Sequence, residues 1–233
     1  MKHDLNKKLG IFNKINMNKY LKEIKNNYRP YDPANYLYKK ILEINNFENK
    51  FSDSFIELVY VTLSAWNMNS RGAKLAPFHQ FKESLLKNKF LLTKLKNKKL
   101  GYKNKHELQS DLDIFKELFY KLDLVGKNKP RLVTFSKVMH FIFPELTFPI
   151  DRAYTLNFFY GHTNLSKDLE KQFEIFSSIF IASNEFVLKN NELGNLKDNN
   201  WNFNVPKIVD NLIIGWVRLN RRVKNVTKNN VDG

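Results

Sequence analysis

The sequence predicts an all-α protein. Eight glycines are few for 233 residues, and all seven prolines fall where a helical pattern begins or ends. Several segments repeat apolar residues at helical spacing, whereas the chain contains no internal repeat, no heptad array and no convincing strand-like alternation. We therefore expect helices separated by polar turns along the whole length.

The first expected helices lie on either side of a proline turn. Residues 16–27 form a polar, amphipathic segment, which ends at the turn 28–31. Asp32 can then serve as an N-cap with Pro33 at the first helical position, where its missing N–H costs nothing. This pattern predicts a helix that runs to about Asn46.

A buried helix is expected from Phe55 to Trp66, after an N-cap at Ser52 or Asp53. The run is apolar nearly all round, as in a central helix, although its Val and Thr content would also suit a buried strand. The polar stretch 67–72 follows directly. A polar loop at the end of a buried element favours a functional site there.

Residues 87–105 carry eight lysines and no acidic residue, with aromatic and aliphatic residues between them. One interpretation is a surface that tracks phosphates; the other is a solvated helix and loop with an apolar underside. The remaining expected helices lie at 77–87, 107–124, 131–143, 151–160, 166–189 and 205–219. The basic residues after them are expected to fray.

Composition restricts the classes of function. The chain has no cysteine, which excludes disulfides, thiolate zinc sites and four-cysteine iron–sulfur clusters. No apolar run approaches the ~20 residues that span a membrane, so we expect no membrane partner and a cytoplasmic, intracellular protein, associated with the nucleoid if it binds DNA. Lys and Arg number 39 against 23 Asp and Glu, giving a net charge of +16 and a pI of about 9.7. An AT-rich coding bias would inflate lysine but would not deplete acids, so this balance favours a nucleic-acid partner.

Two segments together resemble the helix-hairpin-helix DNA glycosylases, the endonuclease III superfamily. Residues 58–75, LVYVTLSAWNMNSRGAKL, are similar to that family's buried Leu-Ser-Ala-Gln-type helix and the polar residues of its base-recognition cleft, with Trp66 in place of the glutamine. Residues 124–159 are similar to its hairpin, next helix and Val-Asp-Thr-His-type catalytic loop. Asp151 falls where the family has its aspartate.

The resemblance implies a two-lobed helical fold. In it, residues 1–50 and 161–220 form a terminal lobe, 51–160 a central lobe with the hairpin-like element, and 221–233 a flexible basic tail. Double-stranded DNA is the implied partner, and no cofactor is implied.

The sequence also departs from the family's pattern. The family's glycine-rich hairpin is here Leu-Val-Gly-Lys-Asn-Lys-Pro at 124–130, with one glycine and two lysines. Where bifunctional members begin the next helix with a lysine nucleophile, this chain has Arg131-Leu132-Val133, and Lys129 and Lys137 lie to either side. A monofunctional enzyme that uses water is therefore expected.

Asp151 is the candidate catalytic residue. Departure of a base from its sugar develops positive charge at the anomeric carbon, which a fixed carboxylate stabilises while it orients or deprotonates water. Asp151 could equally be a plain N-cap, and the two roles are compatible.

The candidate base pocket comprises Trp66, Asn67, Asn69 and Arg71, since a flipped base is held by stacking and edge contacts. Trp66 could instead be core, and Arg71 a surface residue.

The candidate phosphate contacts are Lys127, Lys129, Arg131, Lys137 and Arg152. His140 lies among apolar residues, as a core histidine would, and the five histidines form no ligand spacing, so no metal is assigned.

The leading hypothesis is a base-excision glycosylase that removes a damaged or modified base with Asp151 and water. The alternative is a non-catalytic helical module that binds nucleic acid or a protein partner on the same fold.

Overall fold

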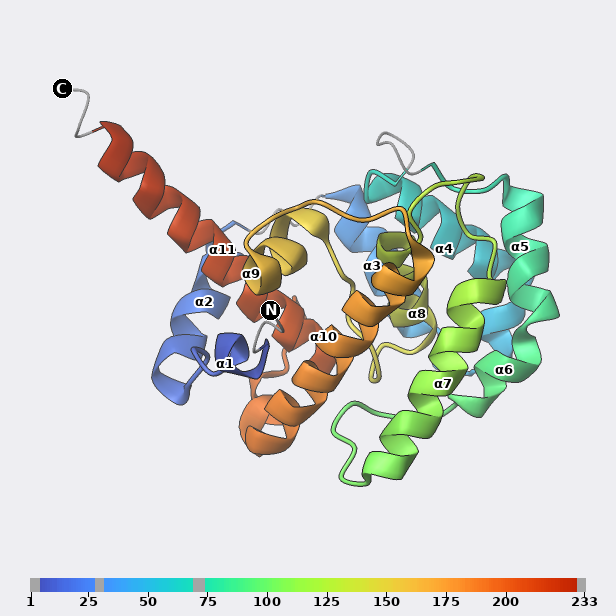
Figure 1. The fold of residues 1–233 in the computed structure, drawn as a ribbon, viewed down its shortest axis with the longest axis horizontal. Coiled ribbons are helices and arrows are strands. Elements are labelled where there is room, and N and C mark those ends of the chain that lie inside the picture. Colours follow the sequence, from blue (N-terminus) through green and yellow to red (C-terminus); the bar gives the residue numbers. More distant parts are fainter. Residues whose placement is uncertain (1–4, 28–31, 69–73, 230–233) are drawn as a thin grey trace.

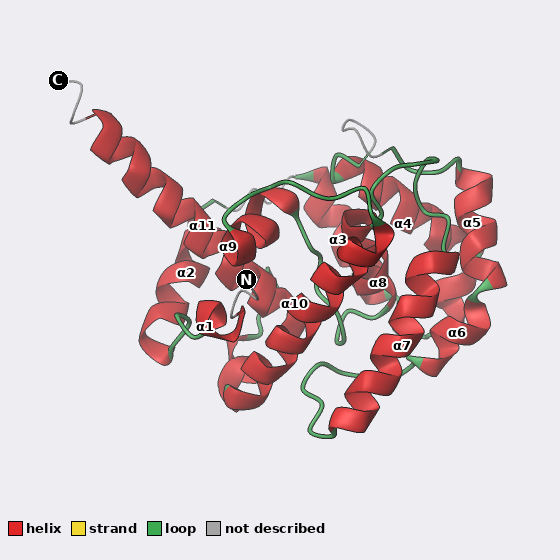
Figure 2. Cartoon of the chain, in the orientation of Figure 1, coloured by secondary structure: helices red, strands yellow, loops and turns green. Residues whose placement is uncertain are grey.

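A computed structural model describes residues 5–27, 32–68 and 74–229. Its α-helices are α1 (Leu5–Leu9), α2 (Lys14–Asn26), α3 (Pro33–Glu43), α4 (Asp53–Ala65), α5 (Phe78–Lys87), α6 (Lys89–Lys94), α7 (Lys105–Lys121), α8 (Leu132–Ile142), α9 (Asn157–Tyr160), α10 (Leu169–Lys189) and α11 (Val205–Asn229). Two 3₁₀ helices, η1 (Glu48–Phe51) and η3 (Asn191–Leu196), and one π-turn, η2 (Arg152–Leu156), complete the set. Within these ranges there is no β-strand, only an isolated bridge between Leu75 and Val125 (Figure 2). The all-α prediction is confirmed.

Local signals placed several helix starts correctly. The Asp32 carboxylate accepts the Ala34 N–H at 2.9 Å at the start of α3, and the Ser52 hydroxyl accepts the Phe55 N–H at 3.3 Å at the start of α4. Because α4 is helical from Asp53 to Ala65, the strand alternative for this run is wrong. Its valines and threonine are accommodated because Thr62 turns its hydroxyl back to the Leu58 carbonyl.

The last helix is longer than the sequence predicted. The expected end near Leu219 is wrong, because α11 continues to Asn229 and projects from the other helices (Figure 1). After Gly215 the chain has neither glycine nor proline until Gly233, so nothing in the backbone stops the helix.

Helices from the two ends of the chain pack together. α11 lies along α2, α1 packs on α10, and α10 reaches α7 and α8 (Figure 1). α3 belongs by sequence with the N-terminal helices but packs against α4 and α8. The element that Asp151 caps, η2, is held against α11.

An aromatic cluster joins the middle helices to α10. Phe135 of α8 meets Phe119 of α7 and Phe176 of α10 edge to face, with ring centroids 5.0 and 5.3 Å apart. All three side chains are buried, and edge-to-face pairs add to the hydrophobic term. These contacts fix the face of α8 that carries Phe135 against α7 and α10.

None of the helices described is both long and apolar enough to cross a lipid bilayer.

Candidate functional site

A large cavity lies where segments from both ends of the chain meet. It has a volume of about 720 Å³, within the usual range of ligand sites. Its polar lining combines three carboxylates with three cations and several amides. These residues are Asp32, Asp151 and Asp210; Lys137, Lys207 and Arg218; and Asn26, Asn27, Asn35, Asn67 and Asn211. Aromatic walls come from Tyr38, Trp66, Tyr154 and Trp201. We call this space the main cavity.

A second space of about 300 Å³, the side cavity, lies next to it. Four residues line both: Trp66, Asn67, Lys137 and Asp151. The side cavity is completed by the turn before α8, including Lys129, and by Arg152 and Lys167. Asp151 therefore lies at the boundary between the two cavities together with Trp66 and Asn67, two of the four residues predicted for the base pocket.

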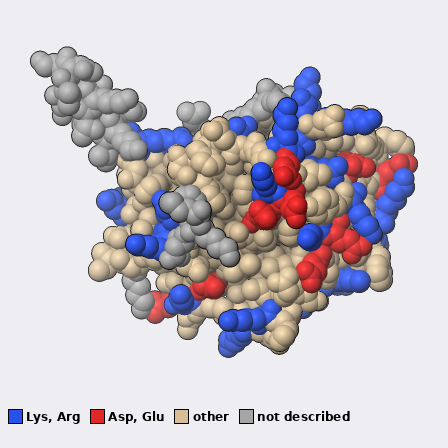
Figure 3. All heavy atoms as spheres, in the orientation of Figure 1, with Lys and Arg blue, Asp and Glu red and all other residues tan. Residues whose placement is uncertain are grey.

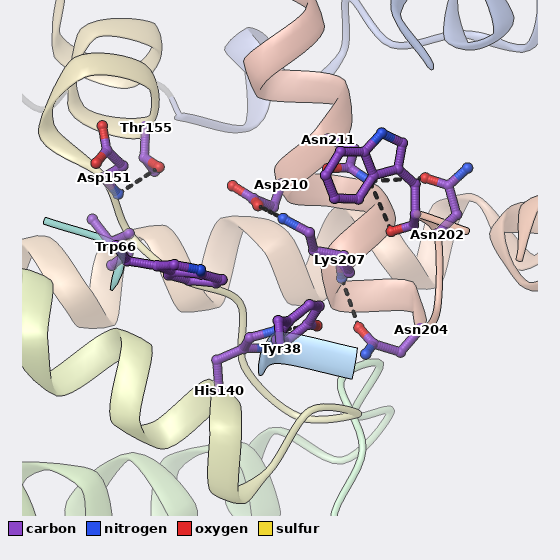
Figure 4. Close-up of polar contacts among 12 residues, drawn as sticks. Tyr38, Trp66, His140, Asp151, Thr155, Asn202, Asn204, Lys207, Asp210 and Asn211 are labelled. Atoms are coloured by element: carbon purple, nitrogen blue, oxygen red, sulfur yellow. Dashed lines mark hydrogen bonds and ion pairs between the residues drawn. The ribbon is translucent and has the colours of Figure 1, made fainter. Parts of the chain in front are cut away.

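Asp151 is fixed at the N-terminus of η2. Its Oδ1 accepts the Ala153 and Tyr154 N–H groups at 2.7 and 3.2 Å, and its own N–H donates to Thr155 Oγ1 at 3.0 Å (Figure 4). Within the described ranges no group bonds Oδ2. The cap thus holds the carboxylate through one oxygen, and the second oxygen is left for a ligand or water at the cavity wall.

The π-turn gives this position an unusual backbone. The Leu156 N–H bonds the Asp151 carbonyl at 3.0 Å, five residues back. Single π-turns occur frequently at functional sites, because the extra residue redirects side chains. N-cap and cavity roles coexist at Asp151.

Trp66 is half-buried and serves as both core and cavity wall. Its indole packs on Phe141 and Tyr38, with centroids 5.0 and 5.6 Å away, and donates to the Ala34 carbonyl at 3.3 Å. Asn67 follows with φ of 63°, a left-handed conformation that asparagine tolerates and that ends α4. Asn69 and Arg71 lie outside the described residues.

Lys137 is not on an outer surface, where a phosphate contact was expected. Its side chain is buried, with Nζ 3.5 Å from Met68 Sδ and 5.3 Å from the centre of the Trp66 ring. A cation over an indole face is stabilised by the ring quadrupole. Lys137 therefore places a positive charge inside the site.

The other predicted phosphate contacts divide into two kinds. Lys127 and Lys129 are exposed in the turn before α8, where the Lys129 N–H bonds the Gly126 carbonyl and Asn128 has φ of 60°. By contrast, the Arg131 guanidinium bonds the Phe119, Tyr120 and Leu122 carbonyls at the end of α7. Arg152 is exposed, but its Nε donates to the Thr163 carbonyl at 2.7 Å.

Four of the eight lysines in the segment 87–105 form ion pairs with carboxylates of the described residues. Lys89 and Lys96 reach Glu48 at 3.0 and 3.8 Å, and Lys98 bonds Glu107. On the face shown in Figure 3, acidic and basic side chains are interspersed over the side formed by α5 to α7. These pairs favour the interpretation of a solvated surface over that of a phosphate track.

Sequence reasoning missed an ion pair in the main cavity. Lys207 Nζ lies 2.6 Å from Asp210 Oδ2 within α11, and both side chains are less than 10% exposed (Figure 4). Burial raises the pKa of Asp210, Lys207 opposes this, and the charge of Asp151 raises it further. A lysine and an aspartate three residues apart look like an ordinary helical surface pair, so only their burial could have identified them.

A hydrogen-bonded chain forms the floor beside this pair. The Lys207 N–H donates to Asn204 Oδ1 at 2.8 Å, capping α11 (Figure 4). The Asn204 side chain also lowers the pKa of the Tyr38 hydroxyl, although burial raises that pKa more strongly. Tyr38 Oη lies 2.6 Å from His140 Nε2, and His140 Nδ1 lies 2.6 Å from the Thr147 carbonyl. Since a carbonyl only accepts, the proton is assigned to Nδ1, and Tyr38 donates to Nε2.

The buried hydrogen bonds of His140 predict that the folded protein loses stability in acid. Burial lowers the pKa of His140 from 6.5 to about 3, with Lys207 and Lys50 acting in the same direction. The unfolded chain therefore binds the proton first, and the free energy of unfolding should fall as the pH drops from about 6.5 towards 3. The imidazole alone should cost about 2 kcal/mol between pH 6.5 and 5.

Urea unfolding at these two pH values checks the expectation. His140→Gln should show a smaller pH-dependent loss than the wild type, while His79→Gln, which removes an exposed imidazole, should keep the wild-type loss. An unchanged pH dependence in His140→Gln would contradict the assignment.

Two arginines of α11 contact η2, and one of them, Arg218, also lines the main cavity. The guanidinium carbons of Arg218 and Arg221 are 5.9 and 5.5 Å from the centre of the Tyr154 ring, and Arg221 bonds the Ala153 carbonyl at 2.6 Å. The site therefore combines flat aromatic walls, a set of amides and carboxylates of which Asn211 and Asp210 are buried, and a cationic edge. Such a set can hold a planar polar group and an attached anion.

Comparison of the chain with models of protein families, with curated proteins and with solved structures finds no match.

Proposed function

We propose that this protein is a monofunctional DNA glycosylase of the helix-hairpin-helix type. It would bind double-stranded DNA, take a damaged or modified base into the main cavity and hydrolyse the N-glycosidic bond with Asp151 and water. In this proposal α7, the turn at 122–131 and α8 form the helix-hairpin-helix element.

The observation that carries the proposal is the arrangement at Asp151. One oxygen is anchored by two backbone amides, the other is unbonded within the described ranges, and the residue lines both cavities with Trp66. A carboxylate held this way can face a developing cation on a sugar without having to reorganise. The Trp66 indole can stack on the flipped base beside it.

The size of the cavity is consistent with this chemistry. A nucleobase with its sugar fits a space of about 720 Å³ and leaves room for the attacking water. Lys137 and Arg218 add positive charge to the same walls, which suits the phosphates that flank a flipped nucleotide.

Formation of abasic sites tests the proposal. Duplexes that each carry one modified base are incubated with the protein and then treated with alkali, which cleaves only at abasic positions. Release of at least one base by the wild type, and its loss in Asp151→Asn, would support hydrolysis at this site. No release from a broad panel would leave the non-catalytic binding module as the function.

DNA binding should depend steeply on salt, because a protein that binds phosphates releases their counterions. Replacing both Lys127 and Lys129 by alanine should reduce the slope of log K against log salt by about 0.9 for each phosphate that the variant no longer neutralises. Fluorescence anisotropy with a labelled duplex measures this slope.

A control variant, Lys87→Ala with Lys94→Ala, removes the same charge from α5 and α6. It should leave the slope closer to the wild-type value. Equal reductions in both variants would mean that net charge, and not the turn before α8, governs binding.

A further inference from the structure

The Lys207–Asp210 pair presents polar atoms to the main cavity. Asp210 Oδ2 bonds Lys207 Nζ at 2.6 Å, whereas Oδ1 has no hydrogen-bond partner within the described ranges. Both residues line the cavity, and each is less than 10% exposed. A donor and an acceptor therefore lie side by side on one wall.

Stability alone does not account for this pair. Lys207 lies in the first turn of α11, where the positive end of the helix dipole disfavours a cation. Removing two charges from water is costly, and apolar residues of similar volume are commonly as stable as a buried pair. A ligand that uses the free oxygen would explain why charges occupy this wall.

We propose that the Lys207–Asp210 pair reads the edge of the base, binding a base that carries a hydrogen-bond acceptor next to an N–H donor. The acceptor, a carbonyl oxygen or a ring nitrogen, would take a hydrogen bond from Lys207 Nζ, and the neighbouring N–H would donate to Asp210 Oδ1. The inference rests on the proposed function, and it narrows the substrate class to bases whose pairing edge is free of alkyl groups.

Neighbouring groups are suited to hold such a base. Trp66 and Trp201 line the same cavity and offer flat faces for stacking, and Asn211 is fixed by bonds to the Trp201 carbonyl and Asn202 Oδ1 at 3.1 and 2.9 Å. Asp151 comes from η2 and the pair from α11, so sugar and base would be contacted by different elements (Figure 4).

Nucleoside binding tests this inference without requiring catalysis. The probes are three pairs: deoxyguanosine with its N1-methyl derivative, thymidine with its N3-methyl derivative, and deoxyadenosine with its N6,N6-dimethyl derivative. Quenching of tryptophan fluorescence reports binding, because Trp66 and Trp201 line the cavity. At least one unmethylated nucleoside should bind about tenfold or more tightly than its methylated partner, since methylation leaves the buried Asp210 oxygen unsatisfied.

Asp210→Asn should remove this preference. If the asparagine oxygen stays on Lys207, the amide turns an N–H towards the N–H of the base. Asp168→Asn is the matched control and should keep the preference: it makes the same charge change outside the cavity, and asparagine can still cap α10. A double variant, Lys207→Met with Asp210→Leu, removes both charges together and should also lose the preference.

Equal affinities within all three pairs, no binding by any unmethylated nucleoside, or an unchanged preference in Asp210→Asn would overturn the inference. Its failure is distinct from failure of the proposed function. Asp151→Asn should keep the nucleoside preference while it loses base release. If the wild type releases bases but binds methylated and unmethylated nucleosides equally, only the role of the Lys207–Asp210 pair is refuted.

Discussion

Asp151→Asn is expected to lower the rate of base release by about 10²–10⁴-fold, the range contributed by a positioned acid or base. The substitution removes the negative charge that would stabilise the sugar cation and deprotonate water. Asparagine is as good an N-cap as aspartate, so Oδ1 can keep the bonds to the Ala153 and Tyr154 amides. Single-turnover release of base from the best duplex substrate measures the effect.

Stability and DNA affinity serve as controls for this variant. Both should stay close to the wild-type values, because the cap and the proposed phosphate-binding lysines are retained. A rate within about threefold of the wild type would remove Asp151 from the chemistry, since a catalytic carboxylate contributes far more.

Borohydride reduction during turnover distinguishes water from an amine nucleophile. We expect no trapped protein–DNA adduct. An adduct that is lost in Lys137→Met would instead assign the nucleophile to Lys137, which lines both cavities with Asp151.

Gly215→Ala is expected to lower the free energy of unfolding by about 2–3 kcal/mol, the upper part of the range for overpacking. A Cβ on Gly215 would lie 2.2 Å from the Tyr20 carbonyl oxygen and 2.8 Å from its carbon. These are backbone atoms of α2 and cannot rotate away, so α2 and α11 must separate. The better helix propensity of alanine recovers only ~1 kcal/mol.

The matched control is Gly194→Ala in η3, where a Cβ would meet nothing within 4 Å. Its stability should stay within about 0.5 kcal/mol of the wild type. Urea unfolding followed by far-UV circular dichroism compares the two variants. Equal stabilities would mean that α2 and α11 can separate without cost.

The close approach of α2 and α11 connects stability to the site. α11 carries Lys207, Asp210 and Arg218 into the main cavity, and α2 ends at its rim with Asn26. A shift between these helices should therefore weaken nucleoside binding as well. Gly215, which permits their close approach, lies five residues beyond Asp210.

Several residues of the cavity lining were candidates from the sequence. Asp151 and Trp66 were chosen because they lie in the two segments that resemble the glycosylase family, and Asp151 also lies at an expected helix start. Lys137 was identified as basic but not as buried, although its helical neighbours are apolar. Arg131 was assigned to phosphate, whereas its guanidinium bonds carbonyls of α7 that only the fold brings near.

By itself the sequence determined the helical class, the N-cap at Asp32, a helix start at Ser52 or Asp53, and an aspartate at the helix start at 151, because each depends on residues within one or two turns. Only the tertiary structure decided that Lys207 and Asp210 share a cavity with Asp151, and that Tyr38 bonds His140 across 102 positions of sequence. Such contacts arise when packing buries polar side chains from distant helices together, and burial then sets their pKa values and partners. A pattern read along the chain contains no information about which distant helix will face it.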